Sequence, residues 1–103
     1  MPENKFSGQA ESDVDVEFDV PPQYKVIFFN DDFTTMEFVV EILMDVFKKS
    51  FEEASAVMLE VHKSGKGIAG IYPYDIAATR TRIAQTRARA AGFPLQIALE
   101  EDS

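Results

Sequence analysis

Residues 24–43 read YKVIFFNDDFTTMEFVVEIL, and this stretch contains the change of pattern that decides the fold. The β-branched and aromatic residues of Tyr24–Phe29 predict a strand. An asparagine and two aspartates follow directly, and apolar residues then recur at helical spacing from Met36 to Phe47. The segment therefore predicts a strand that leads, through a short polar loop, into an amphipathic helix.

An N-terminal capping signal marks the expected start of this helix. Thr34 and Glu37 have the spacing of a capping box, with Thr34 as the N-cap. Phe33 and Phe38 flank the N-cap and match the pattern of a hydrophobic staple. We therefore expect Thr34 to cap the first helix.

A second capping box, formed by Ser50 and Glu53, predicts a second helix. Gly65 and Gly67 follow as the signal that ends this helix and begins a turn. The apolar face of the helix consists of Ala54, Val57, Met58 and Val61. The second helix is therefore also amphipathic.

The rest of the chain predicts three further elements. Residues 67–74, GIAGIYPY, indicate a second strand. A third helix is expected from Asp75 to about Ala91, where Gly92 stops it, and Leu95–Leu99 indicates a third strand. The order β-α-α-β-α-β predicts an α+β sandwich, in which three helices cover one side of a three-stranded antiparallel sheet.

The composition separates an acidic N-terminal part from a more neutral remainder. The chain has 103 residues, which suggests one domain, and 46% of them are hydrophobic. Residues 1–22 contain one lysine and six acidic residues, a net charge of −5 out of −8 for the whole chain. We expect a disordered acidic extension over 1–22 and a folded domain over 23–103. The alternation in Val14–Val20 leaves an edge strand as the alternative.

Several functional classes are excluded or disfavoured by composition. The chain has no cysteine, so it has no disulfide, thiolate nucleophile or sulfur-bound zinc. Its net negative charge disfavours nucleic acid as a partner. No apolar run reaches the roughly 18–20 residues of a membrane span, and the N-terminus lacks the apolar core of a secretory signal. We therefore expect a cytoplasmic protein with neither a nucleic-acid nor a membrane partner.

The polar residues Asn30, Asp31 and Asp32 after the predicted strand have several interpretations. Asn and Asp commonly form turns through hydrogen bonds to nearby backbone groups. An EF-hand calcium site needs further oxygen ligands and a glycine, which this segment lacks, so we expect no metal site. Catalysis by paired carboxylates would need a cleft and a partner group, so we expect no catalytic residue. Turn formation and recognition of a cation both remain open.

Other candidate residues have a plain structural explanation. His62, the only histidine, lies at the edge of the apolar face of the second helix, with no residues that would complete a catalytic triad. Met36, Met58 and Leu95 are most simply core residues, although methionine also lines adaptable binding surfaces. The third helix has four arginines, which are most simply a solvated face but would also suit an acidic partner: Arg80, Arg82, Arg87 and Arg89.

Three segments together carry a longer signature: YKVIFFNDDFTTMEFVVEIL (24–43), AVMLEVHKSGKGIAGIY (56–72) and FPLQIALEED (93–102). They resemble the ClpS family, and the resemblance runs from about Pro22 to Asp102. It implies an adaptor without enzymatic activity or cofactor. Such an adaptor binds proteins with a destabilising N-terminal residue, Phe, Tyr, Trp or Leu, and delivers them to a Clp AAA+ unfoldase–protease for degradation.

The resemblance also implies roles for individual residues. The α-amino group of the ligand would be held by Asn30, Asp32 and His62, while Asp31 would mainly shape the loop. Met36 would act as a gate against Ile and Val. The hydrophobic pocket for the ligand side chain would consist of Thr34, Met36, Val39, Met58, Val61 and Leu95.

The resemblance further implies an unfoldase-docking surface at Asp75 and Arg80, where the family commonly has Glu and Lys, so the charge signs are kept. The partner would be an unfoldase of the ClpA or ClpC type, and we expect a monomer. Thr35 stands where proline is usual, which would leave the loop less rigid. The alternative function is a protein-interaction module like that of the ribosomal stalk, which has a similar topology.

Overall fold

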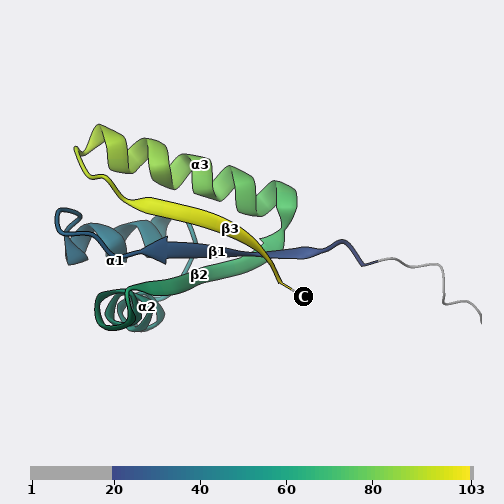
Figure 1. The fold of residues 1–103 in the computed structure, drawn as a ribbon, viewed down its shortest axis with the longest axis horizontal. Helices are drawn as coiled ribbons and strands as arrows, with labels where there is room; N and C mark the ends of the chain where they lie inside the picture. The colour runs from purple at the N-terminus through teal and green to yellow at the C-terminus, as the bar shows by residue number, and fades with distance from the viewer. Residues whose placement is uncertain (1–19, 103) are drawn as a thin grey trace, which may run out of the picture.

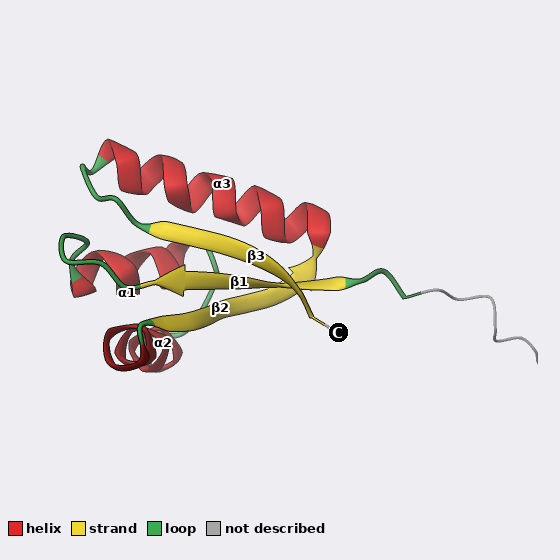
Figure 2. Cartoon of the chain, viewed as in Figure 1, coloured by secondary structure: helices red, strands yellow, loops and turns green. Residues whose placement is uncertain are grey.

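The computed structural model describes residues 20–102, and the fold within them has the expected order of elements. The elements are β1 (Gln23–Phe29), α1 (Met36–Asp45), α2 (Phe51–Ser64), β2 (Lys66–Pro73), α3 (Tyr74–Ala90) and β3 (Gln96–Asp102) (Figures 1 and 2). Residues 20–22 are not part of a strand. The rest of the expected extension, with most of the alternative strand Val14–Val20, lies outside the described residues.

The sheet is antiparallel, with β1 in the centre and the strand order β2-β1-β3. At one end of β1, Phe29 pairs with Lys66 of β2 and Gln96 of β3. At the other end, Gln23 pairs with Pro73 and Asp102. The connections that follow β1, α2 and α3 therefore meet at the Phe29 end, and α3 begins at the Gln23 end (Figure 1).

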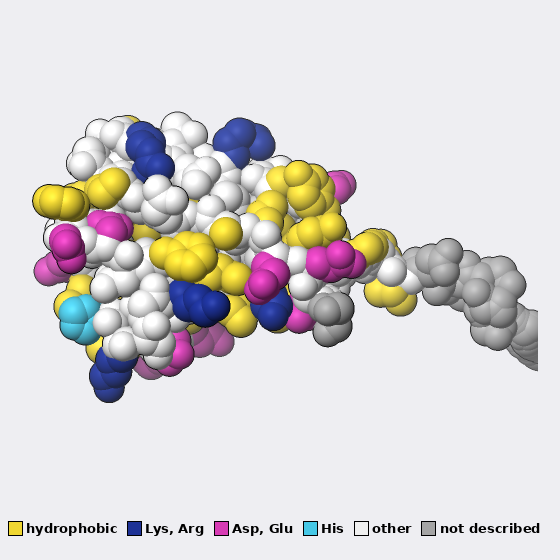
Figure 3. All heavy atoms as spheres, viewed as in Figure 1, with side chains coloured by type: hydrophobic (Ala, Val, Ile, Leu, Met, Phe, Trp, Pro, Cys, Tyr) yellow, Lys and Arg dark blue, Asp and Glu magenta, His cyan; other side chains and the backbone are white. Residues whose placement is uncertain are grey.

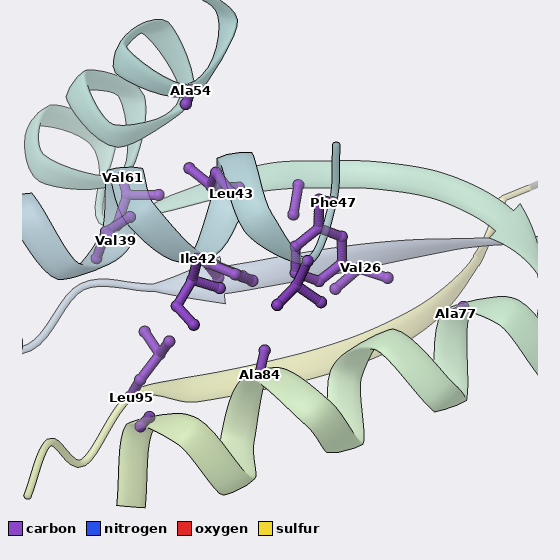
Figure 4. Packing of buried hydrophobic residues seen from close by; sticks show 14 residues of the cluster. Val26, Val39, Ile42, Leu43, Phe47, Ala54, Val61, Ala77, Ala84 and Leu95 are labelled. Atoms are coloured by element: carbon purple, nitrogen blue, oxygen red, sulfur yellow. The ribbon is translucent and has the colours of Figure 1, made fainter. Parts of the chain in front are cut away.

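All three helices contribute to one hydrophobic core on one face of the sheet. Val26 and Phe28 of β1 are fully buried in this core. Lys25 and Ile27 alternate with them and line a cavity on the other face. Figure 4 shows how the core residues converge: Val39, Ile42, Leu43 and Phe47 from the α1 region, Ala54 and Val61 from α2, and Ala77 and Ala84 from α3. The predicted sandwich is therefore confirmed.

The N-terminal cap of α1 differs from the prediction. Thr35, and not Thr34, is the N-cap, and its hydroxyl oxygen accepts a hydrogen bond from the Phe38 N–H at 3.1 Å. The Thr34 hydroxyl instead donates to an Asp31 carboxylate oxygen at 2.7 Å. The capping box expected between Thr34 and Glu37 is therefore wrong, because Thr34 belongs to the loop.

The cap of α2 is confirmed in full. Ser50 accepts from the Glu53 N–H, and the Glu53 carboxylate accepts from the Ser50 N–H. These bonds lower the pKa of Glu53 below its ordinary value. Gly65 ends the helix with φ of +90°, a left-handed conformation in which glycine lacks the steric cost of a Cβ.

The arginines near the end of α3 are not simply a solvated face. One nitrogen of Arg87 lies 3.2 Å from carboxylate oxygens of both Glu41 and Asp45 on α1. Arg89 donates to the carbonyl oxygens of Phe93 and Leu95 in the loop before β3. Both arginines therefore hold neighbouring parts of the fold in place.

Candidate functional site

Three connections lie together at the Phe29 end of the sheet: the loop 30–35, the turn at Gly65 and the loop 91–95 (Figure 1). The pairing of Phe29 with Lys66 and Gln96 brings them there. The only histidine, cyan in Figure 3, lies on the surface at this end, near acidic and apolar side chains. Most of the predicted site residues belong to these connections or to the adjacent helix ends.

Asn30 and His62 are brought close by a backbone contact. The Asn30 N–H donates a hydrogen bond to the Gly65 carbonyl oxygen at 2.9 Å. His62 precedes Gly65 by three residues, in the last turn of α2. Because Asn30 and His62 are both exposed, their polar groups are available to a ligand at this end.

Asp31 organises the loop, as expected. One of its carboxylate oxygens accepts from the N–H groups of Phe33 and Thr34 at 2.8 and 2.7 Å, and the other accepts from the Thr34 hydroxyl. Burial alone would raise the pKa of Asp31, but the hydrogen bonds from Thr34 and Phe33 together lower it below its ordinary value. The Asp31 carboxylate is thus ionised, and both of its oxygens accept hydrogen bonds from groups of the loop itself.

Asp32 has the opposite environment. It is exposed, and within residues 20–102 its carboxylate has no hydrogen-bond or ion-pair partner. The hydrogen bonds of Asp31 fix the backbone on both sides of it. Of the two aspartates, Asp32 is therefore the one whose negative charge remains for a bound cation.

The six predicted pocket residues range from core to surface. Val39, Val61 and Leu95 are 6%, 4% and 1% exposed and belong to one core cluster, against which Met58 packs. Figure 4 shows Val39, Val61 and Leu95 on the same side of the cluster, with Leu95 in the loop just before β3. These residues form an apolar base beneath the loop.

The other pocket residues lie nearer the surface. Thr34 is half-buried in the loop, and Met36, the first residue of α1, is 44% exposed. Met36 and Met58 line the same groove between α1 and α2. Met36 therefore has the exposure expected of a residue at the rim.

Two features of the site were not anticipated. Gly67 lies where α2 crosses β2, and a Cβ atom there would be 2.9 Å from Val61 Cγ2. The groove that contains Met36 also continues to Val40 and Met44, which follow at intervals of four residues. This spacing of one helical turn is visible in the sequence and is the signal that indicates one face of α1.

The two proposed docking residues lie away from this site. Asp75 is exposed in the first turn of α3, next to the end of β2. The Arg80 guanidinium lies 4.9 Å from the centre of the Tyr72 ring. Because β2 ends where Gln23 pairs with Pro73, Asp75 is at the opposite end of the sheet from Asn30.

The described residues show no metal-binding or membrane-spanning feature. Among residues 20–102, no group of three or more His, Cys, Asp or Glu side chains could hold a metal ion. Of the helices in the same part of the chain, none has the length and apolar character needed to cross a bilayer. The polar residues around Asn30 therefore offer hydrogen-bond acceptors without a metal cluster.

Comparison with known proteins identifies relatives over nearly the whole chain. Residues 19–98 match the family model of the ATP-dependent Clp protease adaptor protein ClpS. The ClpS adapter protein of Wolinella succinogenes is 53% identical over 81 residues, which are 79% of this chain and 79% of the relative. That of Oleidesulfovibrio alaskensis is 42% identical over 103 residues, which are 98% of this chain and 99% of the relative.

A solved structure supports the same assignment. Agrobacterium tumefaciens ClpS2 bound to L-phenylalaninamide superposes with a TM-score of 0.77 and 36% sequence identity. The match covers 81% of this chain and 100% of that one. The fold predicted from the sequence is thus that of a known adaptor. The chain belongs to the ClpS family of ATP-dependent Clp protease adaptor proteins.

Proposed function

We propose that this adaptor binds proteins with an N-terminal Phe, Tyr, Trp or Leu and delivers them to a Clp AAA+ unfoldase–protease. The observation that supports the proposal is the Asn30–Gly65 bond, which joins Asn30 to the end of α2, three residues after His62. A related adaptor bound to L-phenylalaninamide, which combines a free α-amino group with a phenylalanine side chain, supports it.

The amino group of the ligand determines which polar residues are needed. An α-ammonium carries a positive charge and three N–H donors, and its intrinsic pKa is about 7.7–8.0. In our proposal the side-chain oxygen of Asn30 and the carboxylate of Asp32 accept hydrogen bonds from it, and His62 completes the set of acceptors. Asp31 holds the loop that presents the first two residues.

The side chain of the first residue would enter above the buried base of Val39, Val61 and Leu95, with Thr34 and Met58 as walls. Burial of a Phe or Leu side chain contributes about 1.5–3 kcal/mol. Met36 lies at the rim and would contact the Cβ of the ligand, which disfavours β-branched Ile and Val. In this proposal the polar groups select for a free amine, and the apolar groups select for a large side chain that is unbranched at Cβ.

Delivery would use the opposite end of the molecule. We assign unfoldase docking, with a ClpA- or ClpC-type partner, to Asp75 and Arg80, so that a substrate and the unfoldase can be bound together. In this proposal the protein acts as a cytoplasmic monomer, with residues 23–103 as the binding domain. Residues 1–22 would be an acidic extension that assists transfer.

The alternative is an interaction module of similar topology, like that of the ribosomal stalk. It would not require Asn30, Asp32 and His62 to act together, and it would not select for a free N-terminal amine. The match of residues 19–98 to an adaptor family favours the adaptor. The two functions differ in their response to acetylation of a peptide, which removes the positive charge and two N–H donors.

Fluorescence anisotropy with labelled peptides that begin with Phe, acetyl-Phe or Ala tests the proposal. We expect tight binding of the Phe peptide alone. Asp32→Ala should weaken it by about tenfold to a hundredfold, as expected for the loss of a charge-assisted hydrogen bond. Glu52→Ala, at an exposed carboxylate on the first turn of α2, is the matched control and should bind normally. Equal binding of the Phe and acetyl-Phe peptides would refute the proposal.

A further inference from the structure

Arg89 lies in the last turn of α3, next to the loop that leads into β3. One nitrogen of its guanidinium group donates to two backbone carbonyl oxygens of that loop, that of Phe93 at 3.0 Å and that of Leu95 at 3.2 Å. A terminal guanidinium nitrogen carries two N–H groups, so it can serve both carbonyls at once. The two hydrogen bonds therefore fix the backbone on either side of Pro94.

Leu95 connects this loop to the proposed pocket. Its side chain is 1% exposed and belongs to the core cluster that contains Val39 and Val61. Figure 4 shows Leu95 just before β3, near the C-terminal end of α3. The position of the Leu95 backbone therefore sets how far its side chain reaches into the base of the pocket.

Arg89 acts between two backbone anchors of the loop. At its start, the Phe93 N–H donates to the Ala88 carbonyl oxygen at 2.8 Å. At its end, pairing with β1 begins at Gln96, one residue after Leu95. Between these anchors, the side chain of Arg89 holds the Leu95 carbonyl oxygen. Arg89 is therefore placed to control the residue that enters the base of the pocket.

The loop also has space on the side away from the core. A cavity there is lined by residues of the loop 30–35, the end of α3 and the loop before β3: Phe33, Arg89, Gly92, Phe93 and Pro94. Without the two hydrogen bonds from Arg89, the loop can move towards this cavity. Leu95 would then withdraw from the base, and the pocket would become deeper.

We propose that Arg89 is a positioning residue that sets the depth of the pocket by fixing Leu95, and that it thereby disfavours Trp relative to Leu as the first residue of the ligand. The inference rests on the proposed function of the Asn30–His62 site and extends it from which residues are accepted to how they are ranked. A fixed base contacts a Leu side chain closely, whereas the larger indole of Trp would be overpacked against it.

Arg89→Met tests this role, because methionine keeps an unbranched apolar stem but has no N–H donor. Arg89 is exposed, so its replacement opens no cavity in the core. Labelled peptides that begin with Leu or Trp and are otherwise identical are titrated by fluorescence anisotropy. We expect the affinity for the Leu peptide to fall about threefold to tenfold, as for the loss of a partly exposed hydrogen bond, and the affinity for the Trp peptide to fall less. Arg89→Lys, which retains N–H donors, should keep a Trp-to-Leu affinity ratio close to that of wild type.

Arg87→Met is the matched control. Arg87 lies two residues away on the same helix and contacts Glu41 and Asp45 on α1 instead of the loop. Its replacement should lower the free energy of unfolding in urea and leave the Trp-to-Leu affinity ratio unchanged. The methyl NMR signals of Leu95 in the free protein give a second readout, since they should shift or broaden in Arg89→Met and stay as in wild type in Arg87→Met.

Three outcomes would overturn the inference. An unchanged Trp-to-Leu ratio in Arg89→Met would refute it, whatever the Leu95 signals show, and would leave the proposed function intact. An equal rise of the ratio in Arg87→Met would also refute it, because a general loosening of α3 would then explain the effect. If the wild-type protein binds the Leu peptide and its N-acetylated form equally, the proposed function fails, and this inference fails with it. Urea unfolding shows whether each variant is folded, and Arg89→Gln replaces Arg89→Met if that variant is not.

Discussion

The backbone N–H of Asn30 donates a hydrogen bond to the Gly65 carbonyl oxygen over 2.9 Å, and this bond joins the end of β1 to the end of α2. It relates two segments that are 35 residues apart in the sequence. Because the contact is between backbone groups, the separation of Asn30 and His62 depends on local backbone conformation. The left-handed conformation of Gly65 is therefore part of the geometry of the site.

Gly65→Ala should lower both stability and ligand affinity. A non-glycine residue at φ of +90° costs about 1 kcal/mol, although no atom lies within 4 Å of the added Cβ. If the backbone moves to relieve this strain, the Gly65 carbonyl group, which accepts the hydrogen bond from the Asn30 N–H, will shift. Urea unfolding and titration with a Phe peptide measure the two effects. Gly65→Asn should lower stability and affinity less, because asparagine tolerates this conformation better than alanine. Equal losses of stability and affinity in the two variants would contradict this explanation.

Gly67→Ala should damage the base of the site through a different mechanism. The added Cβ would lie 2.9 Å from Val61 Cγ2 and 3.3 Å from the Val57 carbonyl oxygen, so α2 would have to move away from β2. Overpacking of this kind costs about 1–3 kcal/mol. We expect a lower unfolding free energy and weaker binding of the Phe peptide.

Ile68→Ala on the same strand is the control for Gly67→Ala, since Ile68 is 44% exposed and does not belong to the core cluster. It should affect affinity little. Wild-type affinity in Gly67→Ala would mean that the position of Val61 does not matter for the ligand.

The sequence predicted the order of the elements because each has a strong local signal. The capping box of α2 is one example, since Ser50 and Glu53 complete each other's hydrogen bonds without help from the rest of the fold. The cap of α1 was misassigned by one residue because Thr34 bonds to Asp31. Spacing alone does not show which of two adjacent threonines a loop carboxylate will use.

Longer-range contacts explain the other differences. Strand β3 extends to Asp102, beyond the predicted Leu99, because β1 offers backbone partners along its whole length. The roles of Arg87 and Arg89 depend on α1 and on the loop before β3. For the site, the sequence supplied residue types and a family resemblance, whereas the approach of Asn30 to the last turn of α2 required the paired strands.

Asp31→Asn should destabilise the loop in a pH-dependent manner. The pKa of Asp31 is lowered in the folded protein, so its ionised form stabilises the fold above the pKa of an unfolded aspartate, about 4. This contribution is lost as the pH falls through the lower folded pKa. We expect the variant to lose about 1–2 kcal/mol at pH 7, which is below the roughly 1.5–3 kcal/mol of hydrogen bonds to a charged group because the loop is partly exposed to solvent.

Urea unfolding at pH 7 and pH 3 measures this effect, and the difference between wild type and Asp31→Asn should become smaller at pH 3. Asp32→Asn is the matched control, because the Asp32 carboxylate has no partner within the described residues. It should change stability little but weaken ligand binding. A difference in stability that is the same at both pH values would exclude ionised Asp31 as its cause.

Asp75 and Arg80 should affect delivery without affecting ligand affinity, because they lie at the opposite end of the sheet from Asn30. Asp75→Lys should bind the Phe peptide within about twofold of wild type, since the exposed charges are separated by more than the Debye length of about 8–10 Å. Degradation of a Phe-starting reporter by the unfoldase–protease should nevertheless decline.

Arg80→Glu should show the same pattern with a small loss of stability, because the Arg80–Tyr72 contact contributes about 0.5–1 kcal/mol. Arg82→Glu, at an exposed position two residues away on α3, is the charge-matched control. Normal degradation with both Asp75→Lys and Arg80→Glu would place the docking surface elsewhere, whereas loss of peptide affinity in Asp75→Lys would mean that the two ends of the sheet are coupled.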